Sequence, residues 1–327
     1  MEKAEMSSLE ATILRTLVYF DLFSYPLTEL EIWKWQFHAE SRISNLESRK
    51  FELIEVVEVL EKSEVLNRLL DHRDGLYFLK GREEIVRERK KRYVISDQKL
   101  KRARFWVRFL QYAPFVEGIG ICNSLGYYNA RKTSDIDLFV IAAPSRIWTV
   151  RLFVTGFLKL FRLRPEKERS QDAMCPSFFL SRSALDMESL VFQPSDPHFQ
   201  FWAMQVVQMY DRNNIFEQLF ESNQWTRRTL PAICLDKMHP RLALRQSALG
   251  IFFRELIERI LRFFPTSEIF VRSLQHRIMP DDLKRLSTDH ESGVVISDSV
   301  LKFHGKDTRK KIRDQFKQKL SLVQHSL

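Results

Sequence analysis

The sequence predicts a helix-rich α+β fold in which a helical unit with a hairpin precedes a small mixed sheet and a C-terminal helical region. Apolar residues recur at three- and four-residue spacing toward both ends of the chain, whereas short apolar runs of strand length lie between them. Only 9 glycines occur among 327 residues, which favours long helices over tight turns. With 44% hydrophobic residues, a chain of this length is expected to form two or three domains.

The N-terminal part of the chain predicts three helices followed by a hairpin. Capping boxes that begin at Ser7 and Thr28 each place a glutamate three residues later, which marks two helix starts. A third helix is predicted over Phe51 to Leu60. Leu66 to Leu70 and Leu76 to Leu79 then flank an Asp-Gly turn, a strong signal for a hairpin. This order of elements is that of a winged-helix unit.

The winged-helix unit, residues 1–80, is expected to be a docking module, with DNA binding as the less favoured alternative. A third helix that reads the major groove carries basic and amide side chains. This one instead carries four acidic side chains, Glu52, Glu55, Glu58 and Glu61. Its acidity therefore argues against readout of base edges by this helix.

Residues 81–114 are predicted to form a basic linker helix. Its positive charges are concentrated between Gly81 and Arg104, among scattered apolar residues. Two interpretations are open, a solvated helix face or the lining of a channel for nucleic acid or nucleotide. The net charge of +10 favours a polyanionic partner through attraction to phosphates.

Residues 115–193 predict the mixed sheet. Apolar strands are expected at Phe115 to Cys122, Ile136 to Ala142 and Met174 to Leu180. A helix capped by Ser145 and running through Leu163 connects the second strand to the third. A small sheet with helices packed against it is the expected catalytic core.

Two carboxylates, Asp135 and Asp137, lie one residue apart at the head of the second strand. Because strand side chains alternate between faces, both point the same way, and the apolar run after them anchors the strand in a core. Two carboxylates aimed at one point can share divalent metal ions, and a pair of Mg²⁺ ions suits displacement at phosphorus. We therefore predict Asp135 and Asp137 as metal ligands and catalytic residues. The alternative is a polar strand entry that caps a turn.

A polar turn, Asn123-Ser124, follows the first strand. The Ser124 hydroxyl and the free amides of a following helix can hold phosphate oxygens. Asn123 tolerates left-handed backbone angles better than most residues, so the tight turn can form. One of four basic side chains near the motif could neutralise triphosphate charge, with a solvated turn as the alternative for each: Arg131, Lys132, Arg146 and Arg151.

The Asn123-Ser124 turn followed by Asp135 and Asp137 resembles the polymerase-beta-type nucleotidyltransferase superfamily, with Asn in place of the usual Gly. The resemblance implies a nucleoside triphosphate substrate, two Mg²⁺ ions, transfer of a nucleoside monophosphate to an acceptor, and a third carboxylate on a later strand. The chain is also similar to an uncharacterised bacterial group of nucleotidyltransferase-like proteins with an N-terminal winged-helix segment. Four segments carry that wider likeness: Phe23 to Thr28, Gly75 to Gly81, Asn223 to Trp225, and Leu301 to His304.

No acid occurs on the strand where the resemblance implies the third carboxylate. Ser177 occupies the inward position, and Asp172 and Asp186 are the nearby substitutes. Two functions are therefore predicted. One is a Mg²⁺-dependent nucleotidyltransferase with an unidentified acceptor, and the other is a catalytically degenerate nucleotide-binding, regulatory or docking protein, which could also bind nucleic acid.

Residues 194–327 are predicted to be a helical region. Apolar spacing indicates helices over Phe199 to Tyr210, Ile215 to Phe220, Pro240 to Phe264 and Lys310 to Leu322. Packing against the core is favoured for the stretch that ends at Phe264, over a position on a membrane surface. His304 is expected to be structural.

The three cysteines, Cys122, Cys175 and Cys234, lack the spacing of a disulfide framework or a zinc site. The charged start of the chain has no signal-peptide pattern. The most apolar windows are short and interrupted by charges. We therefore expect a cytoplasmic protein without membrane contact, whose thiols are reduced and buried.

Overall fold

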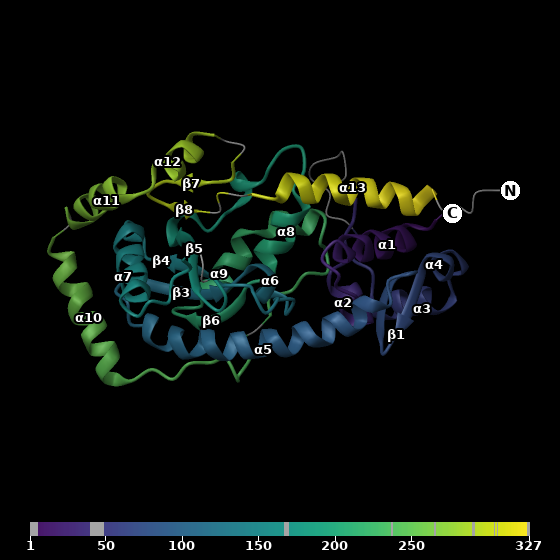
Figure 1. Cartoon of the computed structure of the whole chain (residues 1–327), viewed down its shortest axis with the longest axis horizontal. Helices are drawn as coiled ribbons and strands as arrows, with labels where there is room; N and C mark the ends of the chain where they lie inside the picture. Colours follow the sequence, from purple (N-terminus) through teal and green to yellow (C-terminus); the bar gives the residue numbers. More distant parts are fainter. Residues whose placement is uncertain are drawn as a thin grey trace.

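The computed structural model describes residues 6–39, 49–166, 170–236, 238–264, 266–289, 292–303, 305 and 307–325. Within these ranges it contains thirteen α-helices and eight strands, which confirms the α+β class with a mixed sheet. The first helices of the chain lie at one end of the molecule. Two later helices, α10 (Ala248–Arg262) and α11 (Ser267–Ile278), lie at the opposite end (Figure 1).

The N-terminal unit consists of helices followed by a hairpin, as predicted. Its elements are α1 (Ser8–Asp21), α2 (Glu29–Lys34), α3 (Leu53–Lys62), α4 (Glu64–Leu69), β1 (Leu70–Arg73) and β2 (Leu76–Leu79). Both capping boxes are present, because the side chains of Ser7 and Thr28 accept from the amides of Glu10 and Glu31. The sequence signals for these two helix starts are therefore confirmed.

The segment predicted as the first hairpin strand is largely helical. Residues 64–69 form α4, and the strand begins only at Leu70. The Ser63 hydroxyl caps α4 by accepting from the Leu66 amide at 3.0 Å. Leu66, Leu69 and Leu70 are buried at a spacing that fits one face of a helix, which the strand prediction overlooked.

A single helix, α5 (Glu84–Leu110), connects the N-terminal unit to the sheet, as Figure 1 shows. The predicted basic linker is thus a helix of 27 residues. Several of its positive charges are neutralised within the protein. Arg89 pairs with Glu31 at 2.7 Å, Arg92 pairs with Glu88, and Lys99 pairs with an acid of the sheet region.

Six strands form the sheet in the order β6-β3-β4-β5-β8-β7. Their bounds are β3 (Val116–Ile121), β4 (Ile136–Ala142), β5 (Met174–Ser181), β6 (Val207–Asp211), β7 (Val295–Ile296) and β8 (Val300–Lys302). β4 and β5 are parallel, and the other neighbours are antiparallel. The three strands predicted between residues 115 and 193 are confirmed.

Three further strands come from the region predicted to be helical. The helix expected over residues 199–210 ends at Met204 as α8 (Pro197–Met204), and the remainder forms β6. A short apolar run such as Val207 to Tyr210 is compatible with either helix or strand. Pairing of Tyr210 with Ile119 of β3 selects the strand, and this contact is not visible in local sequence.

The sheet is buried on both faces. Ile136, Leu138 and Val140 pack against α5 and α7 (Ile147–Leu160). Phe139 and Phe178 on the opposite face pack against α8 and α9 (Ile215–Ser222). These helices hold the strand ends in place.

The N-terminal unit shares its core with the remainder of the chain. Tyr19 of α1 stacks on Phe201 of α8 with ring centroids 4.0 Å apart. Phe316 and Leu320 of α13 (Arg309–His325) belong to the same buried cluster. Residues far apart in the sequence therefore build this core together.

Helix α7 begins differently from the prediction that Ser145 caps it. Ser145 has a positive φ of 57°, and the helix starts at Ile147 with no side-chain cap of its own. The Glu268 carboxylate of α11 accepts instead from the amides of Trp148 at 2.7 Å and Thr149 at 3.2 Å. A distant acid thus replaces the local cap.

Helices α12 (Asp281–Thr288) and α13 come last in the chain. Helix α10 begins eight residues after Pro240, where the sequence predicted its start. Cys122, Cys175 and Cys234 are free cysteines, as expected, although Cys234 is exposed. Over the described ranges, every helix is too short or too polar to cross a membrane.

Candidate functional site

Asp135 and Asp137 lie together at the N-terminal end of β4. Asp135 directly precedes the strand, and Asp137 pairs with Cys175 of the parallel strand β5. One ligand atom from each of these three side chains lies within 4.8 Å of the other two, and all three residues are partly buried. The two predicted acids are therefore joined by a thiol that the sequence-based prediction did not include. We call these residues the Asp-Asp-Cys cluster.

A hydroxyl contacts the cluster from the β5 side. Ser177 is 5% exposed and donates from Oγ to Asp137 Oδ1 at 3.3 Å. This places Ser177 inward, as the sequence indicates. The two substitute acids have other partners, because Asp172 pairs with α5 and Asp186 accepts from the Glu188 amide at 2.9 Å.

The two thiols beside the acids are protonated at neutral pH. Burial raises the pKa of Cys175, and the Asp137 and Asp135 carboxylates raise it further, whereas Arg164 lowers it. Burial also raises the pKa of Cys122, whose Sγ lies 3.7 Å from the Asp137 carbonyl oxygen. The acids therefore face neutral sulfur, and a thiolate at Cys175 would need additional positive charge nearby.

Lys99 fixes the loop that leads into the acids. Its side chain is 3% exposed. The Nζ group donates to the carbonyl of Lys132 at 3.1 Å and to that of Ser134 at 2.7 Å, and it pairs with the Asp172 carboxylate. Sequence reasoning missed this role because Lys99 is one of many basic residues in its helix. The residue just before Asp135 is thus held from α5.

Arg131 and Lys132, predicted to bind phosphate, have exposed side chains. Their backbone groups shape the loop, because the Arg131 amide donates to Ser134 Oγ at 3.1 Å and the Lys132 carbonyl accepts from Lys99. The structure therefore places both residues in the loop before Asp135, with their side chains available to solvent.

The basic residues that follow β4 make other contacts. Arg146 donates to the end of α10 and the start of α11, and Arg151 donates to Gln275 of α11. Burial, followed by the charge of Arg164, lowers the pKa of Arg151 to about 10. Arg164 also lowers the pKa of Cys175, so its charge acts on the Asp-Asp-Cys cluster. The sequence-based prediction did not include Arg164.

The Asn123-Ser124 turn forms as the sequence suggests. Asn123 has a positive φ of 56° and begins the short helix α6 (Asn123–Gly126) directly after β3. Its Oδ1 accepts from Trp202 Nε1 at 2.8 Å. A Cβ atom at Gly126 would lie 2.4 Å from the backbone oxygen of Gln205, so only glycine fits there. Ser124 is thereby held at the edge of a cavity.

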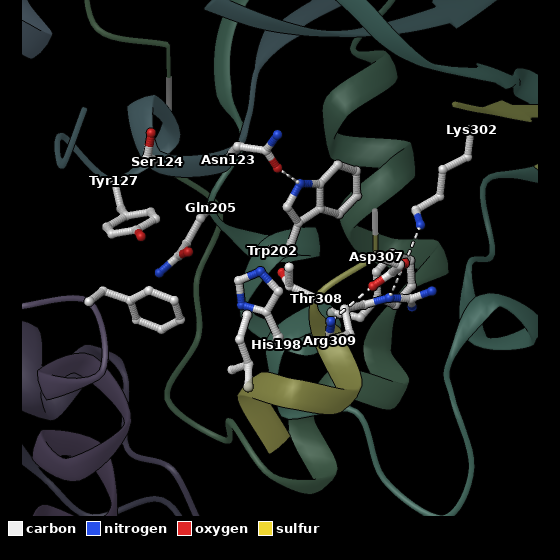
Figure 2. Close-up of a pocket in the computed structure, with 13 residues that line it drawn as sticks. Asn123, Ser124, Tyr127, His198, Trp202, Gln205, Lys302, Asp307, Thr308 and Arg309 are labelled. Atoms are coloured by element: carbon white, nitrogen blue, oxygen red, sulfur yellow. Dashed lines mark hydrogen bonds and ion pairs between the residues drawn. The ribbon is translucent and has the colours of Figure 1, made fainter. Parts of the chain in front are cut away.

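This cavity has a volume of about 310 Å³, and we call it the Trp202 cavity (Figure 2). Asn123, Ser124 and Tyr127 contribute one wall. Across it lie three charged residues of the C-terminal region, Lys302, Asp307 and Arg309, with Trp202 between the two groups in this view. Parts of the chain that are almost two hundred residues apart therefore meet at one site. Local patterns in the sequence do not reveal this meeting.

Two cations and two carboxylates form a buried network at the far wall. Lys302 is 6% exposed, and its Nζ lies 2.8 Å from Asp307 Oδ2. Arg309 pairs with the same oxygen at 2.8 Å and with Asp196 at 2.7 Å. Burial lowers the pKa of Lys302, and Arg309 lowers it further. Burial would raise the pKa of Asp307, but Lys302 and Arg309 hold it below the usual range.

A neutral histidine borders the cavity. Burial lowers the pKa of His198 to about 4, and its Nδ1 lies 3.0 Å from the Tyr19 hydroxyl. The ring stacks on Phe23 with centroids 5.5 Å apart. His304, which the sequence suggested as structural, lies outside the described residues.

The Trp202 cavity and the Asp-Asp-Cys cluster belong to the same face of the sheet. Trp202 packs on Phe139 and Phe178 with centroids 5.7 and 5.1 Å apart. Phe139 follows Asp137 by two residues, and Phe178 pairs with Lys302, so these side chains share one face. No family model matches this chain, and neither a curated protein nor a solved structure matches it.

Proposed function

We propose that this protein is a Mg²⁺-dependent nucleotidyltransferase-like enzyme that transfers a nucleoside monophosphate from a nucleoside triphosphate to an acceptor. The Asp-Asp-Cys cluster carries the proposal, because its three ligand atoms lie within 4.8 Å of one another at the head of two parallel strands. The resemblance of the Asn123-Ser124 turn and the paired acids to nucleotidyltransferases supports it. So does the Trp202 cavity on the same face of the sheet.

The donor set fits Mg²⁺ through its oxygens. Proteins hold this ion by one or two carboxylates together with waters and substrate phosphates, which Asp135 and Asp137 can provide. A protonated thiol is a poor ligand for a hard cation, so Cys175 is not assigned to Mg²⁺. When bound, the ion would neutralise phosphate charge and orient the triphosphate.

The residues of the chain suit binding of a nucleotide beside the cluster. The Ser124 hydroxyl would donate to a phosphate oxygen from the edge of the Trp202 cavity. The rings of Trp202 and Tyr127 would provide aromatic surface for a base. Lys99 would keep Asp135 aimed at the phosphates by holding the preceding loop.

The test is transfer of label from nucleoside triphosphates carrying a labelled α-phosphate, with RNA, protein and aminoglycoside as acceptors. We expect Mg²⁺-dependent labelling that is abolished in Asp137→Ala and retained in the control Asp186→Ala, which removes an exposed acid. Binding of Mn²⁺, followed by its electron resonance signal, provides a readout independent of the acceptor. Equal Mn²⁺ binding by the wild type and both variants would refute the proposed metal site.

A degenerate nucleotide-binding protein is the second candidate. The observation that favours it is Ser177, a hydroxyl that contacts Asp137 from the strand where a third carboxylate is implied. Calorimetry separates the two functions, because a degenerate protein would bind nucleotide without transfer and without dependence on Mg²⁺. Cys175→Asp adds a carboxylate opposite Asp137. Activity that appears only in this variant would favour the degenerate function for the natural chain.

A further inference from the structure

Helix α10 is turned with its charged side toward the protein. Its two buried residues are Arg254 and Glu258, at 5% and 2% exposure. Glu258 Oε1 accepts from the Phe115 amide at 2.9 Å and from Arg212 at 3.0 Å. Arg254 donates to the Tyr210 hydroxyl at 2.8 Å. Helices on protein surfaces ordinarily bury their apolar stripe, so this orientation requires an explanation.

The opposite side of α10 and its C-terminal end present only apolar residues. At 3.6 residues per turn they fall within a sector of about 120° that contains no charged side chain. Each is exposed by between 39% and 78%: Leu249, Phe252, Phe253, Leu256, Ile260, Phe263 and Phe264. The amphipathic helix thus shows its apolar face to the surroundings.

Helix α11 repeats this orientation. Its buried residue is Gln275, which donates to the Trp148 carbonyl at 2.7 Å. Val271 packs against the core, but most of its apolar side chains are outside, with Phe270 at 70%, Ile278 at 66% and Ile269 at 65% exposure. The two helices lie at the end of the molecule away from α1 to α4 (Figure 1). We call the exposed apolar residues of α10, its end and α11 the α10–α11 surface.

The α10–α11 surface is larger than a monomer in water normally exposes. Five of its phenylalanines are each more than half exposed. Since a phenylalanine can bury about 150–250 Å², these rings alone present on the order of 500 Å². The largest apolar patch of a typical monomer is about 300–600 Å², and leucine and isoleucine add to the rings here. A partner is therefore expected.

The charges around this surface indicate what the partner is. Exposed basic residues border it on α10 and α11 and in the hollow that α5 forms with the segment before α10: Lys101, Arg104, Arg108, Arg245, Arg259, Arg262 and Arg277. Glu255 is an exposed acid on α10. A second copy of the chain would bring the same positive rim against this one, which is unfavourable. Anionic lipid headgroups would complement the positive charges of the rim, and the boundary of the acyl chains would accommodate the apolar rings.

We propose that the α10–α11 surface docks on an anionic phospholipid bilayer, with the two helices lying in the interface. The apolar windows of the sequence are too short to span a membrane, and the sequence favoured packing of the stretch that ends at Phe264 against the core over a position on a membrane surface. An interfacial helix needs no spanning length, because only one face enters the lipid. The inward orientation of Arg254 and Glu258 leaves the apolar face of α10 ready for this role.

Sedimentation with vesicles tests the proposal on the full chain. We expect the protein to sediment with vesicles of phosphatidylcholine mixed with phosphatidylglycerol, more weakly at high salt, and to remain in solution with phosphatidylcholine alone. Phe253→Glu and Phe263→Glu should each reduce partitioning by about tenfold or more, since each removes a ring from the lipid. Ile54→Glu, which changes an exposed apolar residue of α3, should sediment like the wild type.

Circular dichroism of each variant establishes that the fold is intact, which is expected because the substituted side chains are exposed. Unchanged sedimentation in the phenylalanine variants would overturn the proposal. So would the absence of vesicle binding together with a dimer, seen by light scattering, that Phe253→Glu converts to a monomer. That second result would assign the surface to another copy of the chain.

Discussion

At the scale of single residues, the site depends on buried polar groups whose partners are distant in the sequence. Lys99 holds the loop before Asp135, and Ser177 contacts Asp137. The sequence predicted the two acids and the Asn123 turn from local spacing. It did not predict Lys99, because alternation and capping patterns describe neighbours along the chain, whereas this lysine acts through a tertiary contact.

Substitution of Lys99 tests its role as a positioning residue. Lys99→Met should lower the free energy of unfolding by about 2 kcal/mol, because two carbonyls and Asp172 lose a donor. It should also weaken Mn²⁺ binding, since the loop before Asp135 is released. Urea denaturation and Mn²⁺ titration measure the two effects. Lys101→Met removes only an exposed pair with Asp97 and should change neither quantity.

His198 predicts a dependence of stability on pH. Its pKa falls from 6.5 to about 4 on folding because the ring is buried. Between these values the unfolded chain binds more protons, so stability is lost as the pH falls from 6.5 toward 4. The loss should be on the order of 2 kcal/mol, reduced from the full shift because the ring borders the cavity. His38, whose burial also lowers its pKa to about 4, adds to it.

Urea denaturation at neutral pH and near pH 5 measures this loss of stability. His198→Gln keeps a polar partner for Tyr19 but cannot titrate, so the free energy of unfolding should fall less in this variant. An identical pH dependence in the variant and the wild type would show that His198 does not contribute.

At the scale of elements, the capping boxes and the apolar strand that have local sequence signals were predicted correctly. Elements whose type or cap depends on contacts with distant residues were not. The capping boxes at Ser7 and Thr28 and the strand from Ile136 to Ala142 are as predicted. Strand β6 was predicted as helix because its apolar run is too short to distinguish the two. Helix α4 was predicted as strand although Ser63 could have indicated its cap. Helix α7 has its cap in another element.

The capping of α7 by α11 gives a prediction for these two elements. Glu268→Ala leaves the amides of Trp148 and Thr149 without their acceptor. The free energy of unfolding should decrease by about 1–2 kcal/mol, as for loss of a helix cap with a favourable charge. Thermal and urea unfolding measure it. Glu255→Ala, an exposed acid on α10, is the control and should lie within about 0.5 kcal/mol of the wild type.

At the scale of the whole molecule, the N-terminal unit and the sheet region are joined by a common core. The Tyr19 ring of α1 contacts the rings of both Phe201 of α8 and Phe316 of α13. The Trp202 cavity is likewise assembled from four distant parts of the chain. The sequence could be divided into segments, but it did not show which segments contact each other. Tertiary contacts between distant segments leave no periodic pattern in the sequence.

This common core predicts cooperative unfolding. Phe201→Ala should lower the free energy of unfolding by about 3–5 kcal/mol, because this ring of α8 is fully buried among aromatic rings of the N-terminal unit. Calorimetry should show a single transition for the wild type. Leu160→Ala, at a side chain that is 77% exposed, should have little effect. Two separate transitions in the wild type would mean that the parts unfold independently.

Helix α5 connects the N-terminal unit to the loop before the acids as one continuous helix. Arg89 pairs with Glu31 of the N-terminal unit. Lys99, about 15 Å further along the same helix, donates to the loop before Asp135. A helix transmits rotation and translation with little bending over this length. A partner that shifts the N-terminal end of α5 would therefore also shift Lys99 and the loop before Asp135. The first eighty residues are thereby connected through α5 to the Asp-Asp-Cys cluster.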